Sequence, residues 1–180
     1  MTGDRNPDDL VRALPVRLDW LEALTEGDDV FTARFGIPVE PGWLDFPEVL
    51  PFALAAARER DEDPWGTHLY FDAADGALVG IGGFKGAPSG GEVELGYAIA
   101  PARRERGLAT AVVAVLVRRA AAAGVMTVTA HTLAEPNAST RVLTKSGFTR
   151  TAELDDPDDG PIWRWERPAK TGSGRQSGPG

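Results

Sequence analysis

Three arginines stand just before the longest predicted helix of the chain: Arg103, Arg104 and Arg106, followed at once by Gly107. The start of a helix carries unpaired N–H groups and a partial positive charge, so three added cations weaken it. A bound polyanion removes this conflict, because the backbone amides and guanidinium groups then share its charge. Gly107 lets the backbone approach such a ligand or adopt a positive φ. We interpret the turn as a pyrophosphate cradle; a solvated basic turn is the alternative.

The segments on both sides place this turn between a strand and a helix. Residues 92–100 have a strand-like pattern, and residues 108–123 form the longest apolar helix pattern, with Gly124 as its C-cap. A β-branched run at 125–133 predicts a buried strand, and residues 137–145 predict a second helix. The order strand, turn, helix, strand, helix therefore surrounds the arginines.

The remaining segments predict helices first and antiparallel strands afterwards. Residues 10–18 suit a first strand, and Asp19 is expected to cap a helix that ends near Gly27. Two strands, 68–72 and 77–84, flank a turn sequence and predict a hairpin. The other expected elements are a helix at 52–58, a strand that begins at Phe148 and a last strand at 162–166.

This order predicts one mixed α/β (α+β) domain with helices packed on a single sheet. A length of 180 residues suits one domain with a sizeable core. We expect the domain to span residues 10–168. Residues 1–9 and the Gly/Ser-rich residues 169–180 are expected to be disordered.

Composition excludes several classes of function. With 27 acidic and 19 basic residues the formal charge is −8, which argues against a broad nucleic-acid or anionic-membrane surface. The absence of cysteine excludes disulfides, thiolate catalysis and cysteine-based metal sites. Two histidines, His68 and His131, are too few to indicate zinc, so no metal is expected. The apolar run 111–117 is too short to span a membrane, and the polar N-terminus lacks a signal core, so we expect a cytoplasmic protein.

At these positions the chain resembles the GNAT superfamily of acetyl-CoA-dependent N-acetyltransferases. Residues 104–109, Arg-Glu-Arg-Gly-Leu-Ala, are similar to the family's Arg/Gln-x-x-Gly-x-Gly/Ala pyrophosphate turn, and residues 94–97 to the strand before it. Residues 137–148 resemble the helix and strand that follow in the branch of ribosomal-protein N-terminal acetyltransferases. The resemblance covers residues 66–166 well and residues 10–65 loosely. It implies a mostly antiparallel sheet that splays at its two parallel middle strands, with helices on both faces.

The resemblance also implies acetyl-CoA as the acetyl donor. Backbone amides of the turn would hold its pyrophosphate, and the pantetheine arm would bond to the preceding strand as an added strand does. Arg103 would reach the ribose phosphate or solvent. Asn137 would contact pantetheine or the strand end, although Asn is also a favoured N-cap. The implied cofactor-binding residues are Ala98, Ile99, Ala100, Arg104, Glu105, Arg106, Gly107, Leu108, Ala109, Thr110, Asn137 and Ser139.

Two residues are candidates for acid–base catalysis. Strand alternation puts Glu94 on the face opposite Val93 and Leu95, so we expect it in the acceptor groove, as a base or as an orienting charge. Relatives often carry a tyrosine in the second helix that protonates the leaving thiolate, and this helix has none. Ser139 is the candidate donor there, with helix capping or cofactor contact as alternatives. His131 lies near the acceptor or packs at the strand end.

The implied function is transfer of the acetyl group from acetyl-CoA to a primary amine, by direct attack in a ternary complex. The amine belongs to a protein N-terminus or to a small molecule. A catalytically silent acyl-CoA-binding module with the same fold is the alternative. An acidic turn suggests a cationic acceptor, against a plain solvated turn, and dimers common in the branch make a homodimer an open expectation. The turn contains Glu153, Asp155, Asp156, Asp158 and Asp159.

Overall fold

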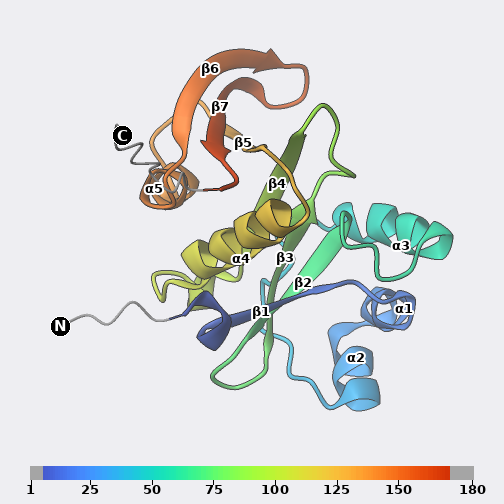
Figure 1. The fold of residues 1–180 in the computed structure, drawn as a ribbon. Helices are drawn as coiled ribbons and strands as arrows, with labels where there is room; N and C mark the ends of the chain where they lie inside the picture. Colours follow the sequence, from blue (N-terminus) through green and yellow to red (C-terminus); the bar gives the residue numbers. More distant parts are fainter. Residues whose placement is uncertain (1–5, 171–180) are drawn as a thin grey trace, which may run out of the picture.

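Seven strands form one sheet in residues 6–170, the part of the chain that the computed structural model describes (Figure 1). Their order across the sheet is β1-β2-β3-β4-β5-β7-β6. The strands are β1 (Val11–Pro15), β2 (Thr67–Asp72), β3 (Leu78–Phe84), β4 (Glu92–Ile99), β5 (Thr127–Leu133), β6 (Thr149–Asp156) and β7 (Gly160–Pro168). Every neighbouring pair is antiparallel except β4 and β5, which are parallel.

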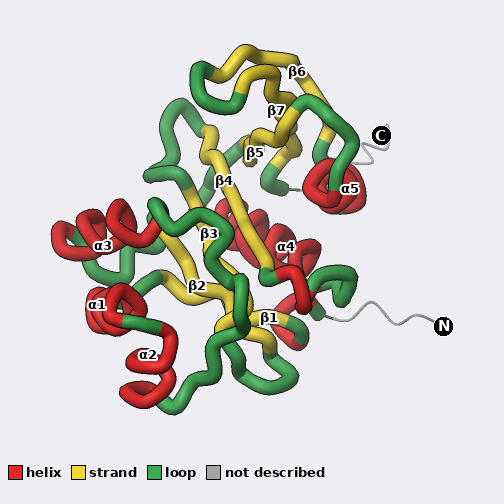
Figure 2. Tube along the Cα trace, turned by 180° about the vertical axis from the view of Figure 1, so that it is seen from behind, coloured by secondary structure: helices red, strands yellow, loops and turns green. Residues whose placement is uncertain are grey.

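Helices cover both faces of the sheet, as Figures 1 and 2 show from opposite sides. One face carries α4 (Leu108–Ala122) and α5 (Ala138–Lys145). The other face carries α1 (Leu18–Glu26), α2 (Asp28–Phe35) and α3 (Val49–Glu59). Two 3-10 helices, η1 (Pro7–Asp9) and η2 (Pro101–Arg103), precede β1 and α4. The predicted fold class is confirmed.

Strand alternation divides the interior into two cores. Val93 and Leu95 of β4 are buried in one core together with α4, whereas Leu69 and Phe71 of β2 are buried in the other together with α1. Because neighbouring side chains of a strand point to opposite faces, Glu94 lies on the face away from α4. Burial of the apolar faces thus fixes the side of the sheet on which the polar residues of β4 appear.

The parallel strands β4 and β5 part after a short contact. They pair only from Glu92 to Glu94 on β4 and from Thr127 to Thr129 on β5. Beyond this point β4 continues to Ile99 against β3 alone, while β5 continues against β7. Figure 2 shows β4 running on toward the start of α4 after β5 has turned away. The predicted splay between the two parallel strands is confirmed.

The start of α1 differs from the expectation. Asp19 is not the N-cap, because the helix begins at Leu18 and Arg17 occupies the cap position. Asp19 lies in the first turn, where its carboxylate forms an ion pair of 2.6 Å with Arg17. A carboxylate in the first turn still interacts favourably with the positive end of the helix dipole, so Asp19 stabilises the same end of the helix from a position two residues after the cap.

Both terminal segments are ordered further than expected. Residues 7–9 form η1, in which Asn6 accepts a hydrogen bond from the N–H of Asp8, and Asp8 pairs with Arg118 of α4 at 2.6 Å. Ala169 is buried and donates a hydrogen bond of 2.8 Å to the carbonyl of Met126. These contacts hold parts of the two segments that were expected to be disordered. The remaining residues of those segments, 1–5 and 171–180, lie outside the described residues.

Candidate active site

The turn before α4 presents a row of backbone N–H groups. Within residues 6–170, no carbonyl or side chain accepts a hydrogen bond from the N–H groups of residues 105–110. Glu105 and Gly107 have left-handed backbone conformations, with φ of 61° and 82°. Such conformations turn successive N–H groups toward one concave side, and the dipole of α4 adds a partial positive charge there. The backbone alone therefore forms a site suited to a diphosphate.

Arg103 does not belong to this row. Its guanidinium is 13% exposed and lies 2.6 Å from Glu40, 3.0 Å from Asp72 and 2.8 Å from Asp75. The expectation that Arg103 reaches a ribose phosphate or solvent is therefore wrong. The residue anchors η2 to the end of β2 and to the segment after α2, so it fixes the position of the turn.

Arg104 and Arg106 are half exposed at the rim of the turn. Arg104 donates hydrogen bonds to the carbonyl of Ile99 at 3.1 Å and to Asp45 at 2.9 Å, and Arg106 lies 3.4 Å from Asp72. The protein's own carboxylates thus compensate the arginines, and the argument from three uncompensated cations fails. The groups left without a partner in this turn are the backbone N–H groups of residues 105–110.

The end of β4 is open on the side that β5 has left. Ala100 donates a hydrogen bond of 2.8 Å to the carbonyl of Val79, and alternate residues of an antiparallel strand bond to the same neighbour. Ala98 and Ala100 therefore bond to β3, whereas the backbone groups of Tyr97 and Ile99 face the opening. Of the three residues expected to bond a pantetheine arm, Ile99 alone has its amide on that side.

Tyr97 reaches across the opening from β4 to α5. Its hydroxyl donates a hydrogen bond of 3.4 Å to the backbone carbonyl of Ser139. Burial raises the pKa of Tyr97 to about 12, although the contact with Ser139 lowers it in part. The hydroxyl therefore keeps its proton at neutral pH and stands between the strand and the helix as a donor.

Asn137 and Ser139 lie at the start of α5. The side chain of Asn137 accepts a hydrogen bond of 2.9 Å from the N–H of Thr140, whose hydroxyl accepts one of 3.0 Å from the N–H of Asn137. Asn137 is thus an N-cap, which was the alternative left open. Ser139 is on the α5 side of the sheet and does not line the pocket of Glu94, so these two candidates are not brought together.

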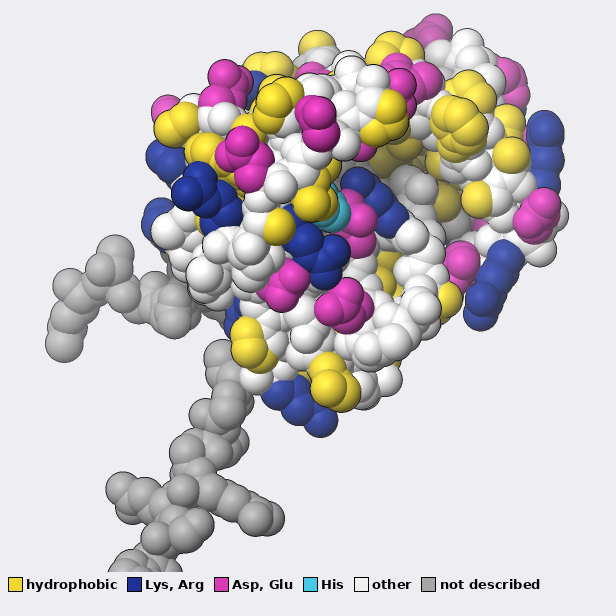
Figure 3. Space-filling model, turned by 90° about the horizontal axis from the view of Figure 1, so that it is seen from above, with side chains coloured by type: hydrophobic (Ala, Val, Ile, Leu, Met, Phe, Trp, Pro, Cys, Tyr) yellow, Lys and Arg dark blue, Asp and Glu magenta, His cyan; other side chains and the backbone are white. Residues whose placement is uncertain are grey.

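Glu94 lies in a pocket of about 440 Å³ on the opposite face. Three carboxylates of the turn between β6 and β7 line this pocket, and three apolar side chains form its wall. Figure 3 shows a histidine among acidic and basic side chains on the face seen there. The acidic residues are Asp155, Asp156 and Asp159, and the apolar residues are Leu133, Leu154 and Ile162.

The acidic residues that were expected near the acceptor make different contacts. Asp155 and Asp159 line the pocket, and Asp156 also accepts hydrogen bonds of 2.9 and 3.0 Å from the N–H groups of Asp158 and Asp159. These bonds lower the pKa of Asp156 and hold the shape of the turn. Glu153 instead accepts a hydrogen bond of 2.8 Å from the indole N–H of Trp163.

Glu94 is held by two basic side chains. Oε1 of its carboxylate accepts from Lys85 Nζ and lies 2.9 Å from His131 Nδ1. Partial burial raises the pKa of Glu94, but the hydrogen bonds from Lys85 and His131 outweigh it and leave the pKa below its usual value. Glu94 is therefore an ionised, already bonded carboxylate and a weak base.

Lys85 was missed in the sequence, although a signal for it exists. Phe84 of β3 pairs with Leu95 of β4, so the next residue outward on each strand, Lys85 and Glu94, must also face each other. Aligning residues 78–84 and 92–99 as the two antiparallel strands of a hairpin would have placed Lys85 opposite Glu94. For His131 the sequence left two alternatives open, a place near the acceptor or packing at the strand end. The structure shows that His131 lines the pocket.

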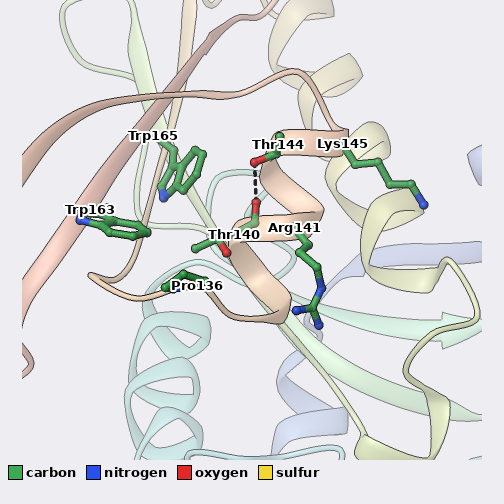
Figure 4. Close-up of a pocket in the computed structure, with 7 residues that line it drawn as sticks. All are labelled: Pro136, Thr140, Arg141, Thr144, Lys145, Trp163 and Trp165. Carbon is green, nitrogen blue, oxygen red and sulfur yellow. Dashed lines mark hydrogen bonds between the residues drawn. The ribbon is translucent and has the colours of Figure 1, made fainter.

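A second hollow, of about 410 Å³, lies between α5 and β7 (Figure 4). Trp163 and Trp165 form one wall and Thr140 the other, while the side chains of Arg141 and Lys145 extend away from the two tryptophans. The indole N–H of Trp165 donates a hydrogen bond of 3.0 Å to the hydroxyl of Thr132. This hollow is on the α5 face and is separate from the pocket of Glu94.

In residues 6–170, no group of three or more His, Asp or Glu side chains is arranged to hold a metal ion. Over the same range, every helix is too short or too polar to cross a bilayer.

Solved structures with this fold include several acetyltransferases. Ribosomal-protein-S5-alanine acetyltransferase from Vibrio fischeri is 13% identical with a TM-score of 0.63, and covers 88% of this chain and 92% of its own. Spermidine/spermine N-acetyltransferase from Vibrio cholerae is 12% identical with a TM-score of 0.64, covering 91% and 95%. The microcin C7 self-immunity acetyltransferase, solved with acetyl-CoA and AMP, is 13% identical with a TM-score of 0.65, covering 90% and 94%. At this identity the likeness shows the fold.

The sequence itself identifies the family. No curated protein matches the chain. The model of the acetyltransferase (GNAT) domain, however, matches residues 20–149, which include the cradle, the splayed strands and α5. Acetyltransferases of this family use acetyl-CoA as co-substrate, in agreement with the prediction. The chain belongs to the GNAT acetyltransferase family.

Proposed function

We propose that the protein transfers the acetyl group of acetyl-CoA to a primary amine by direct attack in a ternary complex. The observation that carries the proposal is the row of unpaired N–H groups at residues 105–110, which stands beside the opening between β4 and β5. On the other face, the pocket of Glu94 lies along the same two strands. A thioester held at the cradle can extend through the opening and meet an amine from the opposite side.

The donor would be bound mainly by backbone groups. The amides of residues 105–110 would hold the diphosphate, with Arg104 and Arg106 adding charge at the rim. The free amide of Ile99 would bond to the pantetheine arm. Acetyl-CoA is an intracellular metabolite, so a cytoplasmic location is part of this proposal.

The acceptor would be a cationic amine with an apolar neighbouring group. Asp155 and Asp159 supply negative charge to the pocket, and Leu133, Leu154 and Ile162 supply the apolar wall. Carboxylates attract an ammonium group and raise its local concentration, while the wall orients the rest of the molecule. A protein N-terminus and an alkyl polyamine both fit this chemistry.

Two measurements test the reaction. Calorimetry with acetyl-CoA tests binding, and a panel of amines coupled to detection of free thiol tests transfer. Binding together with amine-dependent thiol release supports the proposal. Binding without turnover for any amine indicates the silent acyl-CoA module instead, and no binding removes both.

The acceptor site has its own test. Replacing Asp155 and Asp159 together with Asn should raise KM for a cationic amine about tenfold and leave KM for acetyl-CoA unchanged. Asp158→Asn is the matched control, because Asp158 carries the same charge on the same turn but does not line the pocket. An equal change in both variants would mean that general surface charge attracts the acceptor.

A further inference from the structure

The strand pattern favours Glu94 as the base, but the hydrogen bond between Glu94 and His131 points to His131 instead. Both basic partners of Glu94 contact the same carboxylate oxygen, Oε1. The carboxylate is ionised and has no proton to give, so the bond to His131 requires the proton on Nδ1. In the neutral ring Nε2 is then the acceptor.

We infer that His131 Nε2 is the base that takes the proton of the acceptor amine, and that Glu94 is a positioning residue. This inference rests on the proposed function. Glu94 fixes the tautomer and the ring orientation of His131 and stabilises the imidazolium that forms. Lys85 keeps Glu94 ionised and bonded, which makes Glu94 itself a poor proton acceptor.

The proton and electron balance is closed. The bound ammonium first gives one proton to His131 Nε2, which passes it to water. The lone pair of the neutral amine nitrogen then forms the bond to the thioester carbonyl carbon, and the C–S bond breaks with its electron pair left on sulfur. The proton of the attacking nitrogen passes to His131 Nε2. The imidazolium then releases this proton to water, and the coenzyme A thiolate takes one up, so the products are the amide and the free thiol.

The location supports the assignment. The side chains of His131 and Glu94 are 19% and 25% exposed, and both line the pocket proposed for the acceptor. His131 follows Thr129, the last β5 residue that pairs with β4, by two positions on the same face of the strand. It therefore stands at the point where the sheet opens, which is where the amine and the thioester must meet.

Charged groups from three strands and two connecting segments surround this histidine. Arg164 of β7 lies opposite it in the antiparallel pair, but its guanidinium is engaged with Glu166 at 2.7 Å and with Glu92 at 3.1 Å. The other charged residues that share the pocket with His131 are Lys85, Glu94, Asp155, Asp156 and Asp159. Of these groups, Glu94 alone forms a hydrogen bond with His131, at 2.9 Å.

Kinetics of two isosteric variants test the inference. His131→Gln should lower kcat/KM about 10²- to 10⁴-fold and leave the Kd for acetyl-CoA unchanged, because a base is lost. Glu94→Gln should lower kcat/KM only about tenfold, because His131 remains as the base but loses the carboxylate that orients its ring. Added imidazole should restore part of the activity to His131→Ala. Glu22→Gln, an exposed substitution on α1, is the control variant and should keep the wild-type kcat/KM.

The opposite pattern would overturn the assignment: an abolished reaction in Glu94→Gln together with an active His131→Gln makes Glu94 the base. Nitrogen NMR of labelled histidine gives a readout that needs no turnover, with the Nδ1-protonated tautomer expected in the neutral ring and the Nε2-protonated tautomer contradicting it. An inactive wild-type protein would instead remove the proposed function, so the two failures are distinguishable.

Discussion

Nη1 of Arg103 lies 3.0 Å from Oδ2 of Asp72, and both side chains are largely buried. This pair joins the end of β2 to η2, the short helix that leads into the cradle. Glu40 and Asp75 complete the set of carboxylates around the guanidinium. The arginine that the sequence assigned to ligand or solvent is therefore part of the framework that holds the turn in place.

Arg103→Met should lower the free energy of unfolding by about 3 kcal/mol, because it leaves the largely buried Glu40 without its counter-charge and Asp72 with Arg106 alone, at 3.4 Å. Arg118→Met is the matched control: it removes an arginine from the exposed pair with Asp8 and should cost less than about 1 kcal/mol. Denaturant unfolding of both variants measures the difference. Equal losses would mean that the Arg103 cluster stabilises no more than a surface ion pair.

Gly107→Ala should weaken acetyl-CoA binding more than tenfold and destabilise the fold by about 1 kcal/mol, since an L-residue is strained at φ 82° and reshapes the amide row. Gly124→Ala is the control at the other end of α4. It has φ 84° and open space around the added methyl group, so it carries the same strain away from the cradle. Calorimetry and unfolding are measured for both, and equal losses of affinity would contradict the cradle.

Asp45→Asn should raise the affinity for acetyl-CoA about threefold. Asp45 holds Arg104 at 2.9 Å, and its charge competes with an incoming phosphate for the same guanidinium. Glu48→Gln makes the same change of net charge in the same exposed segment and has no ion-pair partner among the described residues. Calorimetry compares the two variants with the wild type. An equal gain in affinity in both variants would mean that Asp45 acts only through the net charge of the protein and not through its ion pair with Arg104.

Local patterns predicted the parts of the site that are close in sequence. The turn from Arg104 to Gly107 lies between β4 and α4 as expected, and alternation along β4 put Glu94 on the face away from α4. The role of Arg103 and the compensation of Arg104 were not predicted, because their partners Glu40 and Asp45 are about 60 residues away in sequence. Such pairs depend on the tertiary packing of α2, α3 and their connection, which carries no periodic signal. The spacing of charges in a turn therefore predicts a site but not which charges are already neutralised.

Burial of His68 makes the fold less stable at low pH. His68 is fully buried, and burial lowers its pKa to about 4, while its Nδ1 bonds to the carbonyl of Gly66 at 2.9 Å. Between the ordinary pKa of about 6.5 and this value the unfolded chain binds the proton and the folded chain does not. The contribution is therefore complete above pH 6.5 and decreases as the pH falls.

The free energy of unfolding should fall by about 2–4 kcal/mol between pH 7 and pH 4 through His68 alone. His68→Gln removes the titrating group and should flatten this part of the curve, whatever its own stability at pH 7. Arg17→Met, on the surface of α1, is the control that should keep the wild-type slope. The measurement is denaturant unfolding between pH 7 and pH 4. If His68→Gln keeps the wild-type dependence of the unfolding free energy on pH, the acid sensitivity comes from carboxylates instead. Glu94 is one such carboxylate, because its lowered pKa also makes stability fall as the pH falls.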